Sequence, residues 1–153
     1  MANQNYAHAN AAFMQAQINL LTGNVKIAAL SPDYPGGAVA IANDQWFTSV
    51  AAYVLAGSNP VRTLTGKTVA VGPNYGVFDA DDTALLGMAA GHTLGYMVYF
   101  IDPDGANIDG MPASGNYGSA RLIHLADEGS NIGTGTNGGD IDVLVNAAGI
   151  FRL

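Results

Sequence analysis

The hydrophobic positions of this chain follow two periods. In segment 9–21, apolar side chains recur at spacings of three and four residues, and Gly23 follows as a stop signal. This pattern predicts one α-helix of about three turns. From Asn24 the period changes to two, with Val25, Ile27 and Ala29 on one face. Such alternation predicts a first β-strand directly after the helix.

Most of the remaining chain has the pattern of short strands. Segments rich in β-branched or aromatic residues recur at intervals of roughly ten residues, bounded by Gly, Pro, Asn or Asp. They are 62–65, 67–71, 75–78, 84–88, 94–101, 119–125, 141–145 and 150–153. Together with the first strand, we expect seven or eight of these segments to form strands. Asn43 and Asp44 are candidate caps for a further short helix within 41–53.

Segment 94–101 is apolar on both faces. Its two sets of alternating side chains are Tyr96, Val98 and Phe100, and Met97, Tyr99 and Ile101. We therefore expect a central strand, because only a strand covered on both sides is apolar on both faces. Stretches 102–118 and 127–139 are rich in Gly, Ser, Asn, Asp and Thr, and we expect loops there, with 133–139 flexible.

The pattern as a whole predicts a mainly β chain. The expected fold is a single-domain antiparallel β-sandwich or jelly-roll-like barrel of seven or eight short strands with one N-terminal α-helix. Residues 1–10 are polar and lack a helix cap, so they are expected to form an N-terminal arm that becomes ordered on a neighbour. Residues 11–153 form the expected β-rich domain.

Charge changes this picture more than any motif does. Only 11% of the residues are charged, against about 25% in an average soluble domain. Surfaces with few charges are typical of the cores of protein interfaces. The net charge of −7, with no basic cluster, argues against nucleic acid as a partner. The chain has no Cys, and we expect no signal peptide, no membrane partner and synthesis in the cytoplasm.

Candidate chemistry is sparse. Asp79, Asp81 and Asp82 could supply ligands for a cation or a carboxylate pair, but a polar turn is the preferred interpretation. Segment 102–109 resembles a calcium loop without matching the EF-hand pattern. The three His residues, at positions 8, 92 and 124, are far apart in the sequence. We therefore expect no enzyme, no cofactor and no metal site.

Several segments resemble a group of small structural proteins of tailed bacteriophages. The N-terminal helix runs into Ile18–Leu30 (INLLTGNVKIAAL), and then come Leu64–Val69 (LTGKTV), Val77–Asp82 (VFDADD) and Asn146–Leu153 (NAAGIFRL). Their order and spacing match across nearly the whole chain, with an insertion over 102–118. The resemblance implies a virion protein, either a capsid decoration (cement) protein or a neck or tail component. Its implied partners are the major capsid protein and copies of itself in a homo-oligomer.

The expected contacts with these partners come from both ends of the chain and from its aromatic residues. They are Asn5, Tyr6, His8, Phe13, Trp46, Phe47, Phe151 and Leu153. The apolar C-terminal segment 150–153 is expected to form an edge strand. Two alternatives stay open: a carbohydrate- or calcium-binding β-sandwich module for host adsorption, and, as the least favoured, a hydrolase that uses Asp79–Asp82.

Overall fold

The structure, a computed structural model, describes residues 4–73, 75–103, 118–128, 131–145 and 148–153. Two α-helices lie in the N-terminal third, α1 (Ala7–Met14) and α2 (Gly37–Asn43), followed by two 3₁₀ turns, η1 (Phe47–Ser49) and η2 (Ala51–Tyr53). The strands are β1 (Gln4–Asn5), β2 (Asn24–Leu30), β3 (Gly57–Asn59), β4 (Val61–Thr63), β5 (Thr68–Val71), β6 (Gly76–Asp79), β7 (Thr83–Met88), β8 (Tyr96–Asp102), β9 (Arg121–Ala126), β10 (Ile141–Val143) and β11 (Phe151–Arg152).

These strands form three antiparallel sheets. The largest has five strands in the order β1-β9-β8-β2-β4, and the two smaller sheets have the orders β10-β7-β3 and β11-β6-β5. The prediction of a mainly β chain is confirmed. The expected closed barrel is wrong, because none of the three sheets closes on itself within the described residues. The C-terminal strand β11 lies at a sheet edge, as the sequence predicted.

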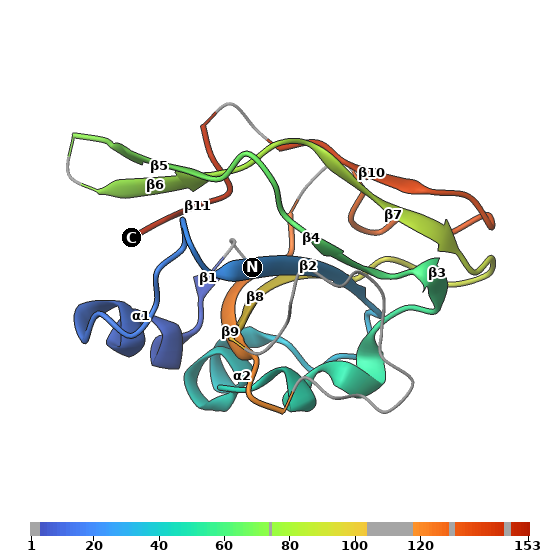
Figure 1. Ribbon diagram of the computed structural model, residues 1–153. Helices are drawn as coiled ribbons and strands as arrows, with labels where there is room; N and C mark the ends of the chain where they lie inside the picture. The colour runs from blue at the N-terminus through green and yellow to red at the C-terminus, as the bar shows by residue number, and fades with distance from the viewer. Residues whose placement is uncertain (1–3, 74, 104–117, 129–130, 146–147) are drawn as a thin grey trace.

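The five-stranded sheet lies between two layers. Figure 1 shows the two small sheets above it and both helices below it. A hydrophobic cluster fills each interface, and alternate residues of β2 and β8 belong to different clusters. Val98 and Phe100 pack on the helix side, whereas Met97 and Tyr99 pack on the side of the small sheets. The prediction of a central strand that is apolar on both faces is therefore confirmed.

Strand β2 is more deeply buried than its sequence suggested. Lys26 alternates with the apolar Val25 and Ile27 in the sequence, yet it is 0% exposed. Its Nζ donates a hydrogen bond to Thr63 Oγ1 on the neighbouring strand β4, at 2.8 Å. A buried ammonium needs such acceptors, because desolvation without them is very costly.

Helix α1 starts and ends earlier than predicted, since the expected range was 9–21. Ala16 adopts a left-handed backbone conformation with φ of 55°. Gln17 N donates to Ala12 O, and Ala16 N donates to Phe13 O. These two bonds are those of a Schellman motif, which ends the helix after Met14. Gly23 is therefore not the helix stop; it lies directly before β2.

The predicted arm over 1–10 is wrong for the described residues 4–10, which fold onto the chain itself. Gln4 and Asn5 pair with β9, and Tyr6 is 0% exposed. The Tyr6 hydroxyl lies 3.2 Å from that of Tyr34, which donates to Asp44 Oδ2 at 2.7 Å. Burial of both phenols raises the pKa of each, which keeps this hydrogen-bonded chain protonated. Apolar contacts and buried hydrogen bonds together outweigh the polar composition of the segment. Residues 1–3 lie outside the described residues.

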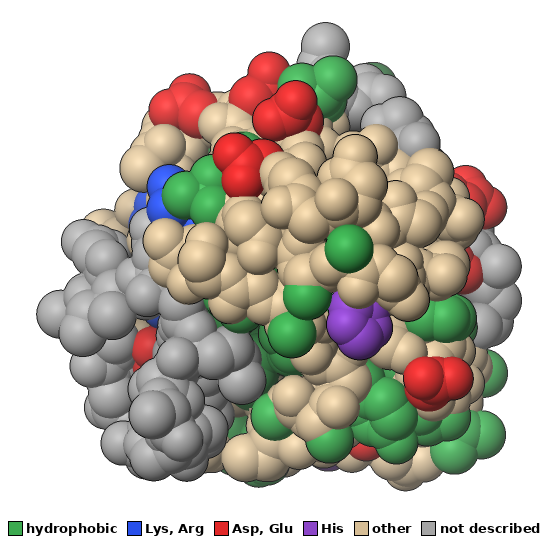
Figure 2. All heavy atoms as spheres, turned by 90° about the vertical axis from the view of Figure 1, so that its right-hand side faces the viewer, with side chains coloured by type: hydrophobic (Ala, Val, Ile, Leu, Met, Phe, Trp, Pro, Cys, Tyr) green, Lys and Arg blue, Asp and Glu red, His purple; other side chains and the backbone are tan. Residues whose placement is uncertain are grey.

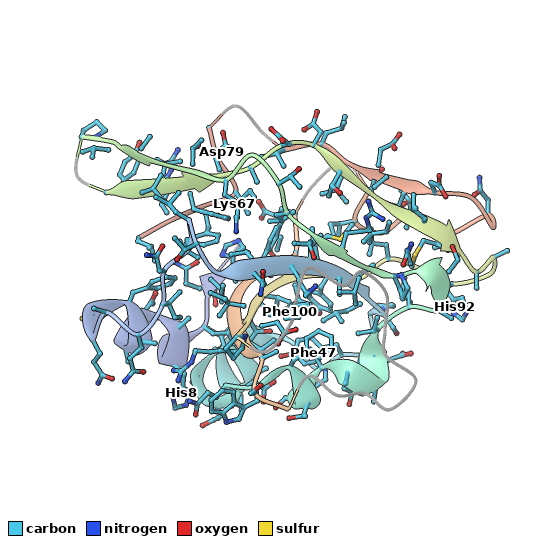
Figure 3. The ribbon with its side chains drawn as sticks, viewed as in Figure 1. His8, Phe47, Lys67, Asp79, His92 and Phe100 are labelled. Carbon is cyan, nitrogen blue, oxygen red and sulfur yellow. The ribbon has the colours of Figure 1, made fainter. Side chains whose placement is uncertain are left out.

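The further short helix expected within 41–53 is a second correction, because the second helix is α2 (Gly37–Asn43). Asn43 and Asp44, proposed as N-terminal caps, lie at the C-terminal end of α2. Segment 47–53 forms only the turns η1 and η2, which place Phe47 against Phe100 with ring centroids 4.2 Å apart (Figure 3). No helix of the described part of the chain is long and apolar enough to cross a membrane.

Loop 127–139 contains the part predicted to be flexible, 133–139, which is instead hydrogen-bonded over much of its length. Its C-terminal part, 133–139, runs along segment 88–94 in a backbone ladder. The bonds include Leu94 N to Thr134 O at 3.0 Å and Thr136 N to His92 O at 2.7 Å. We call segments 88–94 and 133–139 together the glycine ladder. Its Gly and Thr content did not reveal this pairing because the partner segment is distant in the sequence.

The left-handed Ala16 generates a prediction about stability. Ala16→Gly should stabilise the protein by about 1 kcal/mol, because only glycine adopts this conformation without steric cost. Ala11→Gly, inside the same helix, should destabilise it by about 1 kcal/mol or more. Urea unfolding of both variants measures the two values, and a loss of stability in Ala16→Gly would contradict the assignment.

Candidate functional site

Three of the residues predicted to contact partners are buried in the chain itself. Tyr6, Phe47 and Phe151 are 0%, 1% and 4% exposed. Tyr6 and Phe47 belong to the helix-side cluster, and Phe151 belongs to the cluster beneath the small sheets. Without a rearrangement they are not available to a neighbour, so the structure corrects this part of the prediction. These three aromatic side chains are part of the hydrophobic core.

The other five predicted contact residues reach the surface in different degrees. Asn5, His8 and Phe13 are half-buried, whereas Trp46 and Leu153 are exposed. They fall into separate groups. Asn5 Nδ2 donates to the Arg152 carbonyl at 2.7 Å, which places it beside the C-terminus. A contact of any of these residues with a partner stays a prediction.

His8 and Trp46 are linked through Arg121. Its guanidinium carbon lies 5.0 Å from the centroid of the Trp46 ring, and its Nη1 lies 3.5 Å from His8 O. Trp46 and Arg121 also form an isolated backbone bridge. Segments distant in the sequence therefore meet at one place on the helix side of the central sheet.

The carboxylates of Asp79, Asp81 and Asp82 do not converge on a common point. Asp79 Oδ1 accepts the Ala80 amide at 2.9 Å, Asp81 Oδ2 accepts the Thr65 hydroxyl at 3.2 Å, and Asp82 Oδ1 accepts the Val145 amide at 2.7 Å. Each side chain holds a different turn or loop. This arrangement agrees with the polar-turn interpretation.

The described residues contain no group of three or more His, Asp or Glu side chains placed to hold a metal. His8 and His92 lie at opposite ends of the molecule (Figure 3), and His124 is buried in the central sheet. Of the calcium-like segment 102–109, residues 104–109 lie outside the described residues.

His124 is an ionisable side chain that is held in place by burial, a ring contact and a hydrogen bond. It is 3% exposed, and its ring stacks on Phe151 with centroids 5.1 Å apart. Its Nδ1 lies 2.7 Å from Asn5 Oδ1, an acceptor, so Nδ1 carries the proton. Nε2 is buried without a hydrogen-bond partner among the described residues. Burial lowers the pKa of His124 to about 4, and the charge of Asp127 opposes that shift in part.

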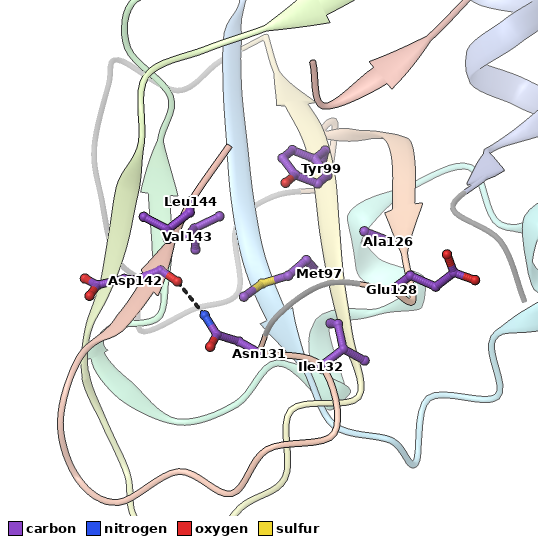
Figure 4. Close-up of a pocket in the computed structure, with 9 residues that line it drawn as sticks. All are labelled: Met97, Tyr99, Ala126, Glu128, Asn131, Ile132, Asp142, Val143 and Leu144. Carbon is purple, nitrogen blue, oxygen red and sulfur yellow. Dashed lines mark hydrogen bonds between the residues drawn. The ribbon is translucent and has the colours of Figure 1, made fainter. Parts of the chain in front are cut away.

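A small cavity opens between the ends of β8, β9 and β10 (Figure 4). Its volume is about 90 Å³, and its lining includes Met97, Tyr99, Glu128 and Val143. Asn131 Nδ2 closes one side by donating to the Asp142 carbonyl at 2.6 Å. Burial raises the pKa of Tyr99 to about 12. Binding pockets for small organic molecules measure roughly 300–1,000 Å³, so this cavity suits water rather than a substrate.

Strand β5 is the most exposed strand of the described chain. All four of its residues are exposed, Val69 to 51% and Val71 to 95%. It is an edge strand, and no other described strand pairs with its outer side. The hairpin that it forms with β6 extends past the central sheet at the upper left of Figure 1. An apolar edge of this kind is a template for pairing with another chain.

A second surface has few charges. The glycine ladder contains no Lys, Arg, Asp or Glu. Figure 2 shows the face on that side of the molecule, with uncharged polar groups and backbone over its centre and most acidic side chains near its margins. This surface and the β5 edge were not among the predicted contacts. The sequence did not reveal that these surfaces are exposed, because a strand pattern does not show whether the strand lies in the middle or at the edge of a sheet.

The buried His124 generates a prediction about acid stability. The unfolded chain has the ordinary pKa of 6.5, so it binds a proton between pH 6.5 and about 4 that the folded chain excludes. The stability is therefore complete above about pH 6.5 and falls as the pH approaches 4. Between pH 7 and pH 5 this residue alone should cost about 2 kcal/mol.

Urea unfolding at these two pH values tests the prediction with His124→Gln, whose amide still donates to Asn5 but does not titrate. The variant should lose less stability between pH 7 and pH 5 than the native chain. His92→Gln, at an exposed histidine, should behave like the native chain. Equal losses in His124→Gln and the native chain would rule out His124 as the cause.

Comparisons with models of known protein families, with curated proteins and with solved structures each found no match to this chain.

Proposed function

We propose that this chain is a structural, non-enzymatic subunit of a virion. In this proposal it is a capsid decoration (cement) protein that binds and stabilises the shell of major capsid protein and contacts copies of itself. A place in the neck or tail of the particle is the alternative. The observation that carries the proposal is the free, apolar edge of β5, and the resemblance to small phage structural proteins supports it.

The physical argument rests on what an exposed edge strand does. Its outward backbone N–H and C=O groups stay unpaired until another strand joins them, and proteins that remain monomeric usually protect such edges with Lys, Pro or bulges. Strand β5, Thr-Val-Ala-Val, carries none of these. Val69 and Val71 add apolar area that a partner would remove from water. Strand addition is therefore the contact that this edge favours.

A decoration protein also gains from having several modest contacts. Attachment at several points makes the second and later contacts intramolecular, so weak single contacts add up to tight binding. The charge-poor glycine ladder offers a second surface besides the β5 edge. With 11% charged residues in the whole chain, little charge has to be desolvated when such surfaces are covered.

The finer architecture belongs to this proposal as well. The hydrophobic cluster between the central sheet and the small sheets supports the expected β-sandwich. The jelly-roll connection of the strands is part of the same expectation.

The edge contact is tested with Val71→Lys. The charge on the edge should weaken self-association of the purified chain by about tenfold or more, as measured by sedimentation across a concentration series. Val39→Lys is the matched control, because Val39 on α2 is 75% exposed and the charge change is the same. A native chain that stays monomeric at all concentrations, or an equal effect of both variants, would remove β5 as the subunit contact.

The place in the particle is tested separately by labelling intact virions with an antibody against this chain. Label over the shell supports decoration, and label confined to the neck or tail supports the alternative. Virions without any label would contradict the proposed function.

A further inference from the structure

A cleft lies at one end of the central sheet, where β2 begins, β8 ends and β9 begins. Its volume is about 510 Å³, within the roughly 300–1,000 Å³ that is usual for small-molecule sites. The segment between α1 and β2, the end of β8 and the start of β9 form its walls, and Trp46 lies at one side. The proposed contacts with copies of the chain leave this cleft free.

Trp46 makes the cleft chemically distinctive. It is the only Trp of the chain, it is 37% exposed, and no described residue accepts a hydrogen bond from its indole N–H. A large aromatic ring with an unused donor presents both an apolar face and a polar edge. Such a side chain can stack on the C–H face of a ligand and bind a ligand oxygen at the same time.

Arg121 provides further donors beside the ring. Its guanidinium packs on Trp46 at 5.0 Å, and its one hydrogen bond within the described structure is the long contact of 3.5 Å to His8 O. A guanidinium has five N–H donors, so most of them stay available. Stacking on the indole fixes the plane of the group before any ligand arrives.

The remaining lining favours a neutral, hydroxyl-rich ligand. Gln17 and Asn24 contribute side-chain amides, which both donate and accept hydrogen bonds. The carboxylate of Asp102, a residue that is 3% exposed, balances the charge of Arg121 in the lining. A phosphate-bearing ligand would need several cations, and a lipid would need a mostly apolar lining. The cleft has neither.

We propose that this cleft binds carbohydrate, with Trp46 stacked on a pyranose ring and Arg121 and Gln17 hydrogen-bonded to its hydroxyl groups. This function is independent of β5 and of a structural role in a particle. It would allow the same chain to hold a saccharide surface while the β5 edge contacts neighbouring subunits.

The test uses the full chain and a panel of neutral oligosaccharides, namely maltotriose, cellotriose and chitotriose. Because Trp46 is the only tryptophan, its fluorescence reports directly on the cleft, and calorimetry gives the dissociation constant. We expect at least one of the sugars to shift the Trp46 emission with a dissociation constant in the millimolar range or below. No shift and no heat with any of the three sugars overturns the proposal.

Two variants assign the binding to the cleft. Arg121→Met keeps an unbranched stem over the indole but removes the donors, and Trp46→Ala removes the stacking face; each should weaken binding by about tenfold or more. Arg152→Met is the matched control, because Arg152 also lies over an aromatic ring, 4.5 Å from the centroid of Tyr75, and does not line the cleft. Its affinity should equal that of the native chain.

Other results would count against the cleft. Sugar binding that survives both Arg121→Met and Trp46→Ala would place the ligand elsewhere. Binding only of a heparin oligosaccharide, with none of the neutral sugars, would assign the cleft to an anion instead. Urea unfolding of each variant shows whether it is folded, and Arg121→Met alone decides the assignment if Trp46→Ala unfolds.

Discussion

The architecture depends on one constraint: the central strands β2 and β8 are apolar on both faces and must be covered on both. They pair over seven residues, Asn24–Leu30 against Tyr96–Asp102. Val25, Ile27 and Ala29 need one cover, and Ala28 and Leu30 need another. A single layer cannot hide both faces from water. The N-terminal segment with the two helices forms one cover, and the two small sheets form the other.

This requirement explains why segments that look dispensable in the sequence are part of the fold. The polar residues 4–10 bring Tyr6 and Ala9 to the helix side, where both are fully buried. The segment between β2 and β3 brings Tyr34 and Phe47 to the same cluster. Aromatic residues that suggested an interface are used to cover the central sheet. Burying such aromatic side chains gains about 1.5–3 kcal/mol each, which opposes the conformational entropy lost when the segment becomes ordered.

In contrast to the central sheet, each small sheet needs to be covered on one face only. Phe78 and Phe151 turn inward and pack together with ring centroids 5.1 Å apart. No other part of the described chain covers β5 beside them, and all four of its residues are exposed. The unprotected edge of β5 belongs to a small sheet, whereas the cleft at Trp46 lies at the end of the central sheet. The two proposals follow from this separation: one surface suits pairing with protein, and the other suits a small polar ligand.

The sequence by itself determined the local elements: the mainly β character, an N-terminal helix, and most strands to within a few residues. It also identified β8 as central and 150–153 as an edge strand, because alternation is a local pattern that a strand carries wherever it lies. Only the tertiary structure decided which aromatic residues are core, that Lys26 is buried, that 133–139 pairs with 88–94, and that β5 is free. Burial and pairing depend on partners distant in the chain, and a local pattern contains no information about them.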